Sequence, residues 1–305
     1  MRSLFALVFL ISFIFFSCSS EDNPISQIQS PSKFINLEEE AKLIPWNELS
    51  GKIAYVKYDT ILLINCDERS IKKLARKPVL SNMKWNNNGT MITGMRLNTS
   101  SYFIYYLEGI DLEGNKTELK TNLNFSNGNF DWLPDGRIVY WNIYNRKIII
   151  EDEELPVEGL VRTGGIVLFN GLACSYDGQK IMVSTSTWDT TQFTTGMQLV
   201  EVDINTLSKQ VMTTSNSSWP RFGSIIYAPN DYRGLYIKNF PDGGGRMLYL
   251  TPNQLLKEGA YGSAWSPDGN KILVAYDSDI YLVDINNLTI ETKVLTDASL
   301  PMWTD

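Results

Sequence analysis

The chain has 305 residues, and its 27 basic and 34 acidic residues give a formal net charge of -7. An acidic chain without a cluster of lysine and arginine is a poor match for the phosphates of nucleic acid, so we discount that class of partner. Histidine is absent, which excludes Ser-His-Asp and Cys-His catalytic arrangements and the common histidine-ligated zinc and iron sites.

The first seventeen residues have the order of a secretory signal. Arg2 precedes an apolar run from Leu4 to Phe16, and the small residue Ser17 precedes Cys18. The run is shorter than the roughly 18 residues of a membrane-spanning helix. We therefore expect residues 1–17 to be a signal peptide.

The residues around Cys18 predict a lipid anchor. Phe15-Phe16-Ser17-Cys18 resembles the lipobox of bacterial lipoproteins, in which the cysteine is lipidated, although that family prefers leucine in place of Phe15. The following Ser19-Ser20-Glu21-Asp22 resembles the signal that sends Bacteroidetes lipoproteins to the cell surface. The resemblance implies lipidation of Cys18 and an outer-membrane location, at the cell surface or in the periplasm.

A polar segment separates the anchor from the rest of the chain. Residues 18–33 are rich in Ser, Asn, Gln and Pro and lack apolar periodicity, which is typical of a flexible tether. Residues 37–43 can form one or two helical turns before Pro45. Because helices this short are marginal alone, we expect this segment to dock on the domain that follows.

One motif recurs from Trp46 to the end of the chain, and Trp265-Ser266-Pro267-Asp268-Gly269 is its fullest copy. The first, aromatic position of the motif is occupied at residues 46, 85, 132, 174, 227, 265 and 303, so it advances by 39, 47, 42, 53, 38 and 38 residues. Spacings of about 40 to 50 residues are typical of propeller blades. Seven positions enclose six repeats.

Each repeat predicts a meander of short strands. Asn88-Gly89, Asp135-Gly136, Asp177-Gly178 and Asp268-Gly269 are strong signals for tight turns, and alternating apolar strands follow them. A second repeated pattern in the sequence places an aspartate at the end of a predicted strand, at Asp111, Asp203 and Asp284. Their carboxylates are suited to bonding the amides of the next turn, and we prefer that role to calcium binding.

Beyond the anchor, the chain has only Cys66 and Cys174. Cys66 lies in a predicted strand of the first repeat, and Cys174 replaces an aromatic residue in the fourth copy of the motif. We expect two separate buried thiols rather than a disulfide.

These repeats resemble the PD40, or WD40-like, repeats of TolB-type six-bladed β-propellers, whose blade boundary reads W-S-P-D-G before a lysine and an apolar strand. Residues 265–272 match almost fully and residues 132–138 match well, whereas Cys174, Tyr227 and Asp231 depart from the pattern. The resemblance implies an all-β fold, a six-bladed propeller of four-stranded antiparallel blades over residues 34–305. The α/β domain that precedes the propeller in TolB has no room here.

The chain ends on a partial motif, Pro301-Met302-Trp303. A propeller ring closes when one end of the chain supplies a strand to the blade made by the other end, which removes an exposed edge. We expect residues 296–305 to close the ring.

Insertions into the repeat supply the candidate binding residues. Residues 184–196 lengthen the fourth repeat, residues 215–223 precede the fifth copy of the motif, and residues 240–246 lie within the fifth repeat. Since loops on a rigid scaffold carry recognition and Trp and Arg are favoured at hot spots, we select Trp188, Trp219, Arg221 and Arg246. The alternative, in which both tryptophans pack between blades, stays open.

The sequence favours a lipid-anchored, non-enzymatic propeller that binds an envelope protein or a glycan, as a monomer and without cofactor, metal or catalytic residues. The lack of histidine also argues against the related oligogalacturonate lyases, which depend on it. An enzyme that acts on polysaccharide through paired carboxylates is the alternative, and it requires two acidic side chains about 5 to 10 Å apart in one pocket. A purely structural ring is a third possibility.

Overall fold

The computed structural model describes residues 34–305 except 77–80, 98–103, 143–146, 157–165, 190–193, 216–220, 228–233, 240–245, 252–253, 259 and 261. The chain divides into two units, residues 1–35 and residues 36–305. Because the described range begins at residue 34, the predicted signal peptide, Cys18 and the tether lie outside it.

The second unit begins with two short helices, α1 (Leu37–Leu43) and the 3-10 helix η1 (Trp46–Glu48). The side chain of Asn36 caps α1 by accepting a hydrogen bond from the Glu38 amide at 3.1 Å. Pro45 follows the helix, as expected for a residue that cannot continue it. The predicted helical turns over residues 37–43 are confirmed.

The remaining elements are strands. The first sheet has the order β23 (Ala298–Thr304), β1 (Lys52–Lys57), β2 (Thr60–Asn65) and β3 (Ser70–Arg76). The second has the order β10 (Glu153–Leu155), β9 (Lys147–Ile150), β8 (Ile138–Asn142), β7 (Lys116–Trp132), β6 (Ile104–Asp111), β5 (Met91–Leu97) and β4 (Ser81–Trp85).

Three further sheets follow in chain order, each a four-stranded antiparallel meander. They are β11 (Ile166–Cys174), β12 (Lys180–Asp189), β13 (Thr194–Asp203) and β14 (Lys209–Ser215); β15 (Arg221–Tyr227), β16 (Gly234–Asn239), β17 (Arg246–Thr251) and β18 (Gln254–Glu258); and β19 (Gly262–Trp265), β20 (Lys271–Tyr276), β21 (Asp279–Asp284) and β22 (Asn287–Leu295).

The described strands thus form five sheets, where the repeats predicted six separate blades. The cause is β7, which has 17 residues and is not interrupted. Its first part pairs with β6 as far as Asn124, and its second part pairs with β8 from Phe125 onward. One strand therefore joins two repeats into a seven-stranded sheet.

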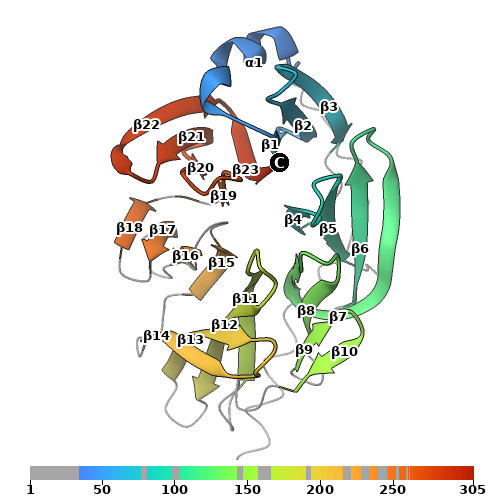
Figure 1. The fold of residues 1–305 in the computed structure, drawn as a ribbon, viewed down its shortest axis with the longest axis vertical. Coiled ribbons are helices and arrows are strands. Elements are labelled where there is room, and N and C mark those ends of the chain that lie inside the picture. Colours follow the sequence, from blue (N-terminus) through green and yellow to red (C-terminus); the bar gives the residue numbers. More distant parts are fainter. Residues whose placement is uncertain are drawn as a thin grey trace, which may run out of the picture. The chain divides into compact units, whose positions relative to one another are not determined.

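The sheets are arranged around a common axis, as in a propeller (Figure 1). The innermost strands are β23, β4, β7, β11, β15 and β19 (Figure 1). Contacts join β23 to β4, β4 to β7, β7 to β11, β11 to β15, and β19 to β23. Large side chains fill the space between neighbouring sheets: Trp141 packs with Ile181, and Leu74 packs with Trp85. Each such side chain contributes about 1.5 to 3 kcal/mol when fully buried.

Strand β23 supplies the innermost strand of the first sheet, paired with β1. The register shifts between Met302 and Ser299, and Pro301 falls inside that shift, where no ladder amide is needed. The predicted pairing of the last residues with the first repeat is confirmed.

Helix α1 docks against β3 and β22, the outer strands of two sheets. Glu40 and Lys57 form an ion pair at 2.5 Å whose side chains are less than a tenth exposed, and Lys57 also donates to the Thr296 carbonyl at 2.7 Å. The expected docking of residues 37–43 is therefore made through a buried charge pair.

Candidate functional site

One side of the ring carries the motif turns, and we call it the turn face: Asn86–Gly89, Leu133–Gly136, Ser175–Gly178 and Ser266–Gly269. The same pattern of hydrogen bonds occurs in two of these turns. The Ser175 hydroxyl donates to Asp177 at 2.6 Å and accepts from the Lys180 amide at 2.9 Å, and Ser266 does the same with Asp268 and Lys271. The motif residues thus have a structural role, as predicted.

Neighbouring turns also touch one another. The glycine of each described turn has a positive φ, between 63° and 89°. A Cβ placed on Gly178 would lie 3.0 Å from Pro134, and one on Gly136 would lie 3.5 Å from Asn87, so the third residue of one motif covers the glycine of the next. In the fourth copy the third residue is Tyr176, whose side chain is half exposed.

Hydrogen bonds lower the pKa of two aspartates of these turns and of one aspartate in the turn between β13 and β14. Hydrogen bonds from Arg137 lower the pKa of Asp135, the Ser266 hydroxyl lowers the pKa of Asp268, and amides of the following turn lower the pKa of Asp203. Asp111, Asp203 and Asp284 accept from backbone amides two residues further on, at 2.8 to 3.0 Å. The prediction of turn chemistry at these three residues is confirmed.

Closer to the axis of the ring, an ion pair makes hydrogen bonds to backbone groups on the free edge of strand β11. Lys84 and Asp131 lie 3.2 Å apart, Asp131 accepts from the Cys174 amide at 2.9 Å, and Lys84 donates to the Leu172 carbonyl at 3.4 Å. Cys66 and Cys174 are both free and buried, as predicted. Burial raises the pKa of the Cys66 thiol to about 11, so it is protonated at neutral pH.

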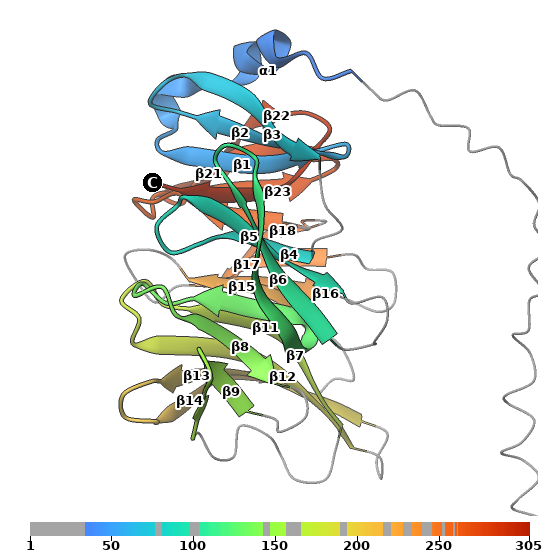
Figure 2. The same cartoon turned by 90° about the vertical axis from the view of Figure 1, so that its right-hand side faces the viewer.

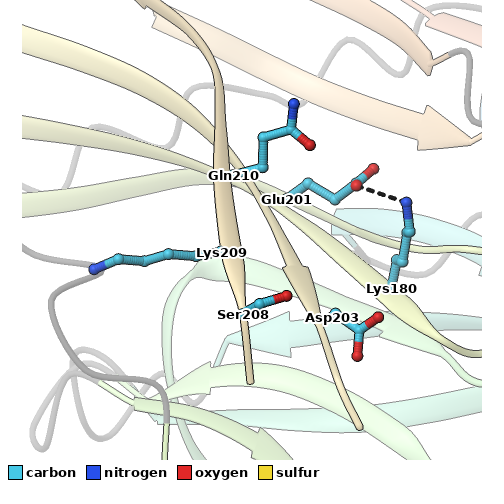
Figure 3. A pocket seen from close by; sticks show the side chains of 6 residues that line it. All are labelled: Lys180, Glu201, Asp203, Ser208, Lys209 and Gln210. Atoms are coloured by element: carbon cyan, nitrogen blue, oxygen red, sulfur yellow. Dashed lines mark hydrogen bonds and ion pairs between the residues drawn. The ribbon is translucent and has the colours of Figure 1, made fainter. Parts of the chain in front are cut away.

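A depression of about 310 Å³ opens where β12 begins and β13 ends, and Figure 3 shows the residues around it. Its lining residues are Lys180, Glu201, Asp203, Ser208, Lys209 and Gln210. Lys180 and Glu201 form an ion pair at 2.8 Å, and the Glu201 side chain is 8% exposed. Sequence reasoning did not select these residues, although Lys180 and Asp203 stand at repeated motif positions.

A second depression, of about 220 Å³, lies beside the start of β20, as the first lies beside the start of β12. It is lined by Asn47, Glu48, Leu49, Ser50, Ser266, Asp268, Lys271 and Trp303. Lys271, which matches Lys180 in the repeat, donates here to the Glu48 carbonyl at 2.9 Å. The lysine after one motif therefore pairs with a strand of its own sheet, and the lysine after the other bonds to η1.

The opposite side of the ring is the far face, where β12 ends and β15 and β17 begin. Figure 2 shows the ring from its edge, with the turn between β13 and β14 and the chain end on the left, and β12 running to the right. Strand direction brings Trp188, Arg221 and Arg246 to this face. Trp219 lies outside the described residues.

The register places two of these candidates in one row. Arg221 pairs with Asn239, and Asn239 pairs with Arg246. Since neighbouring strands are about 4.8 Å apart, the backbones of the two arginines lie about 10 Å apart in that row of the sheet. Trp188 pairs with Ile166 and Thr195 at the end of the β11–β14 sheet, and β12 contacts β15.

We expected a loop over residues 184–196, but residues 184–189 and 194–196 extend β12 and β13. Strands β12 and β13 pair without interruption from Lys180↔Asp203 to Asp189↔Thr194. The equivalent pair β20 and β21 runs only from Lys271↔Asp284 to Tyr276↔Asp279. Four extra residue pairs at about 3.3 Å each carry the β12–β13 hairpin about 13 Å further.

Among the described residues, no three His, Cys, Asp or Glu side chains gather in a group that could hold a metal ion. No described helix is long and apolar enough to cross a membrane.

No protein-family profile matches the sequence, and no curated protein matches it. Among solved structures, the chain is similar to a putative TolB from Agrobacterium tumefaciens, with 14% identity and a TM-score of 0.51 over 82% of this chain and 89% of that one. The fold is a TolB-like β-propeller. At this identity the likeness concerns the fold alone.

Two further structures are similar at lower scores. One is a chain of a mitotic checkpoint complex, with 14% identity and a TM-score of 0.44 over 75% of this chain and 86% of that one. The other is an oligogalacturonate lyase from Vibrio parahaemolyticus, with 13% identity and a TM-score of 0.42 over 81% of this chain and 85% of that one.

Proposed function

We propose that the chain is a lipid-anchored, non-enzymatic propeller that binds an envelope protein through the far face of the β11–β14 and β15–β18 sheets. The observation that carries this proposal is the β12–β13 hairpin, which extends four residue pairs beyond the equivalent hairpin of the last sheet. We expect two strands with this many paired residues to be rigid, and rigid elements position contact residues better than loops do.

The chemistry of the partner follows from the row Arg221–Asn239–Arg246. Guanidinium groups bind carboxylates in a bidentate manner, and Trp and Arg are the residues favoured at interface hot spots. We take the two arginines, at paired positions of one sheet, as the positive charge that the partner meets, in a chain with a net charge of -7. We therefore expect the partner to present acidic side chains there.

The charges of the described carboxylates support binding over catalysis. Glycoside hydrolysis by paired carboxylates needs one of them protonated at working pH. Glu201 and Asp203 lie two residues apart in one depression, but Glu201 is paired with Lys180 and turn amides lower the pKa of Asp203. The pKa is lowered at Asp111, Asp135, Asp203, Asp268 and Asp279.

The membrane anchor is part of the proposal, based on the apolar run from Leu4 to Phe16 and on Cys18. Lipidation of Cys18 would hold the protein at the outer membrane, on the cell surface. Metabolic labelling of host cells with a fatty-acid analogue tests it: wild-type protein should be labelled, and a Cys18→Ala variant should not.

The binding proposal is tested by affinity capture of the tagged, lipidated protein from cross-linked cells of its native host. We expect a partner that is lost from the Arg221→Ala/Arg246→Ala variant and from the Trp188→Ala/Trp219→Ala variant. Arg137→Ala, which removes an exposed arginine of the turn face, is the matched control and should retain the partner. A partner retained by all variants, or no partner at all, would contradict the proposal.

A further inference from the structure

Helix α1 crosses the seam where the ring closes. It contacts β3 of the first sheet and β22 of the last, and Figure 1 shows it at the outer edge of the ring, over these two sheets. Strand β23 follows β22 in the chain and pairs with β1 in the first sheet. A side chain that points from α1 into the ring therefore enters the seam between the first and last sheets.

Two side chains of β1 lie close to Glu40 in this seam. Tyr55 and Lys57 are two residues apart, so their side chains leave β1 on the same face, whereas Val56 packs with Trp85 on the other face. Tyr55, Lys57 and Glu40 are all buried. Burial raises the pKa of Tyr55, and the charge of Glu40 raises it further, which places the two side chains near each other. The three side chains form one buried polar group.

Protein groups satisfy only part of this polar group. Glu40 Oε1 accepts from Lys57 Nζ, which also donates to the Thr296 carbonyl at 2.7 Å. An ammonium has three donors, so these two bonds leave Lys57 one more. Among the residues that the structure describes, four buried side-chain polar atoms have no hydrogen-bond partner, and two of the four are Glu40 Oε2 and the Tyr55 hydroxyl.

Buried polar atoms are nearly always bonded to protein or to ordered water, because an unbonded one keeps the full cost of its desolvation. The carboxylate oxygen, the hydroxyl and the third ammonium donor make three polar groups, the usual number around a buried water. Water both accepts and donates, which suits a group with donors and an acceptor. A metal cation suits it less, because the Lys57 ammonium belongs to the same group and repels it.

We infer that one water molecule binds in the seam, where it bridges Glu40 Oε2, the Tyr55 hydroxyl and the Lys57 ammonium. The water completes the joint by which α1 ties the first sheet to the last. Because α1 follows the predicted tether, this joint also fixes the place at which the tether leaves the ring. The inference rests on the described contacts of α1 and β1, so it depends on neither the lipid anchor nor the far-face partner.

A crystal structure of the full-length protein, at a resolution that shows ordered water, tests the site directly. We expect one water oxygen within about 2.6 to 3.2 Å of both Glu40 Oε2 and the Tyr55 hydroxyl. A direct hydrogen bond between Tyr55 and Glu40, a bound ion, or a seam without water would each overturn the inference.

The sign of a stability change gives a second test. Without a water, the Tyr55 hydroxyl is a buried group with no partner, so Tyr55→Phe should raise the melting temperature of the full-length protein. With the water bound, the same variant removes one of its partners and should lower the melting temperature by about 2 to 4 °C. The Tyr55 ring is retained, so the variant keeps its packing in the seam.

Tyr58→Phe is the matched control, because it removes an exposed hydroxyl that donates to Asp297 at 3.0 Å. A surface change of this kind should shift the melting temperature by less than about 2 °C. A melting temperature that is unchanged or raised in Tyr55→Phe would contradict the bound water.

Discussion

Two constraints act on the glycines of the turn face. Each has a positive φ, and two of them, Gly136 and Gly178, also lie under a residue of the neighbouring turn. The first constraint could be predicted from the sequence, because Asp-Gly and Asn-Gly are typical of tight turns. The second could not, because it depends on which turns the ring brings together.

A pair of variants separates the two constraints. In Gly51→Ala the new Cβ would overlap the Thr304 carbonyl oxygen, whereas in Gly136→Ala it would meet only Asn87 at 3.5 Å. Both variants carry the left-handed backbone cost of about 1 to 3 kcal/mol. We expect Gly51→Ala to lose more stability in chemical denaturation, since β23 must also move. Equal losses would show that the contact with β23 is unimportant.

The turn carboxylates predict an acid-sensitive fold. The pKa of Asp268 is lowered chiefly by the Ser266 hydroxyl, and that of Asp135 chiefly by Arg137. Such groups stabilise the fold above their unfolded pKa of about 3.9, and this contribution disappears as the pH falls through the lower folded pKa. We expect a constant melting temperature from pH 7 to about 5 and a fall below about pH 4. Asp268→Asn should melt lower at pH 7 and show a shallower acid decline; identical acid profiles would refute this role.

The residues of the depression at β12, β13 and β14 were harder to find from sequence. Glu201 is an ordinary polar residue of an alternating strand, and only the register shows that it pairs with Lys180. Trp188, Arg221 and Arg246 were selected from composition, and whether they bind a partner remains a prediction.

At the scale of elements, the strands depart from the repeat in two places. The segment between β6 and β8 contains Ser126-Asn127-Gly128-Asn129, yet β7 passes through it as one strand. The polar residues 184–189 read as a loop, but they continue β12 because β13 pairs with each of them. Pairing with β13 overrode local preference in β12. In β7 the register with β8 shifts between Phe125 and Phe130, so this explanation does not extend to residues 126–129.

Helix α1 depends on one buried charge pair. Glu40→Ala would leave the Lys57 ammonium buried without its carboxylate, which costs about 3 to 5 kcal/mol. The neighbouring Glu39 is exposed and paired only with Lys42, so Glu39→Ala is a matched control that should cost at most about 1 kcal/mol. Equilibrium unfolding in urea measures both. A small loss for Glu40→Ala would mean that α1 is not an integral part of the propeller.

At the scale of the whole molecule, the fold class could be predicted because one motif recurs at blade spacing along most of the chain. The count of sheets could not, since two repeats merge through β7. Ring closure by β23 ties the last residues to the first strand, so the stability of every sheet depends on both ends of the ring.

Removal of residues 296–305 tests this dependence. It deletes β23 and exposes the partners of Met302 and Trp303, each worth about 1.5 to 3 kcal/mol. At about 2 to 4 °C per kcal/mol, we expect the melting temperature to fall by about 10 °C or more. Deletion of residues 19–33, the predicted tether, is the control and should leave it unchanged. A truncated protein that melts at the wild-type temperature would contradict ring closure.

The binding of an acidic envelope protein to the far face can be examined by photo-crosslinking in living host cells, with a photoreactive amino acid at position 188, 246 or 137. We expect positions 188 and 246 to capture the same protein and position 137, on the turn face, to capture none. Capture of that protein from position 137 alone would place the binding surface on the opposite side of the ring and refute the proposed function of the far face.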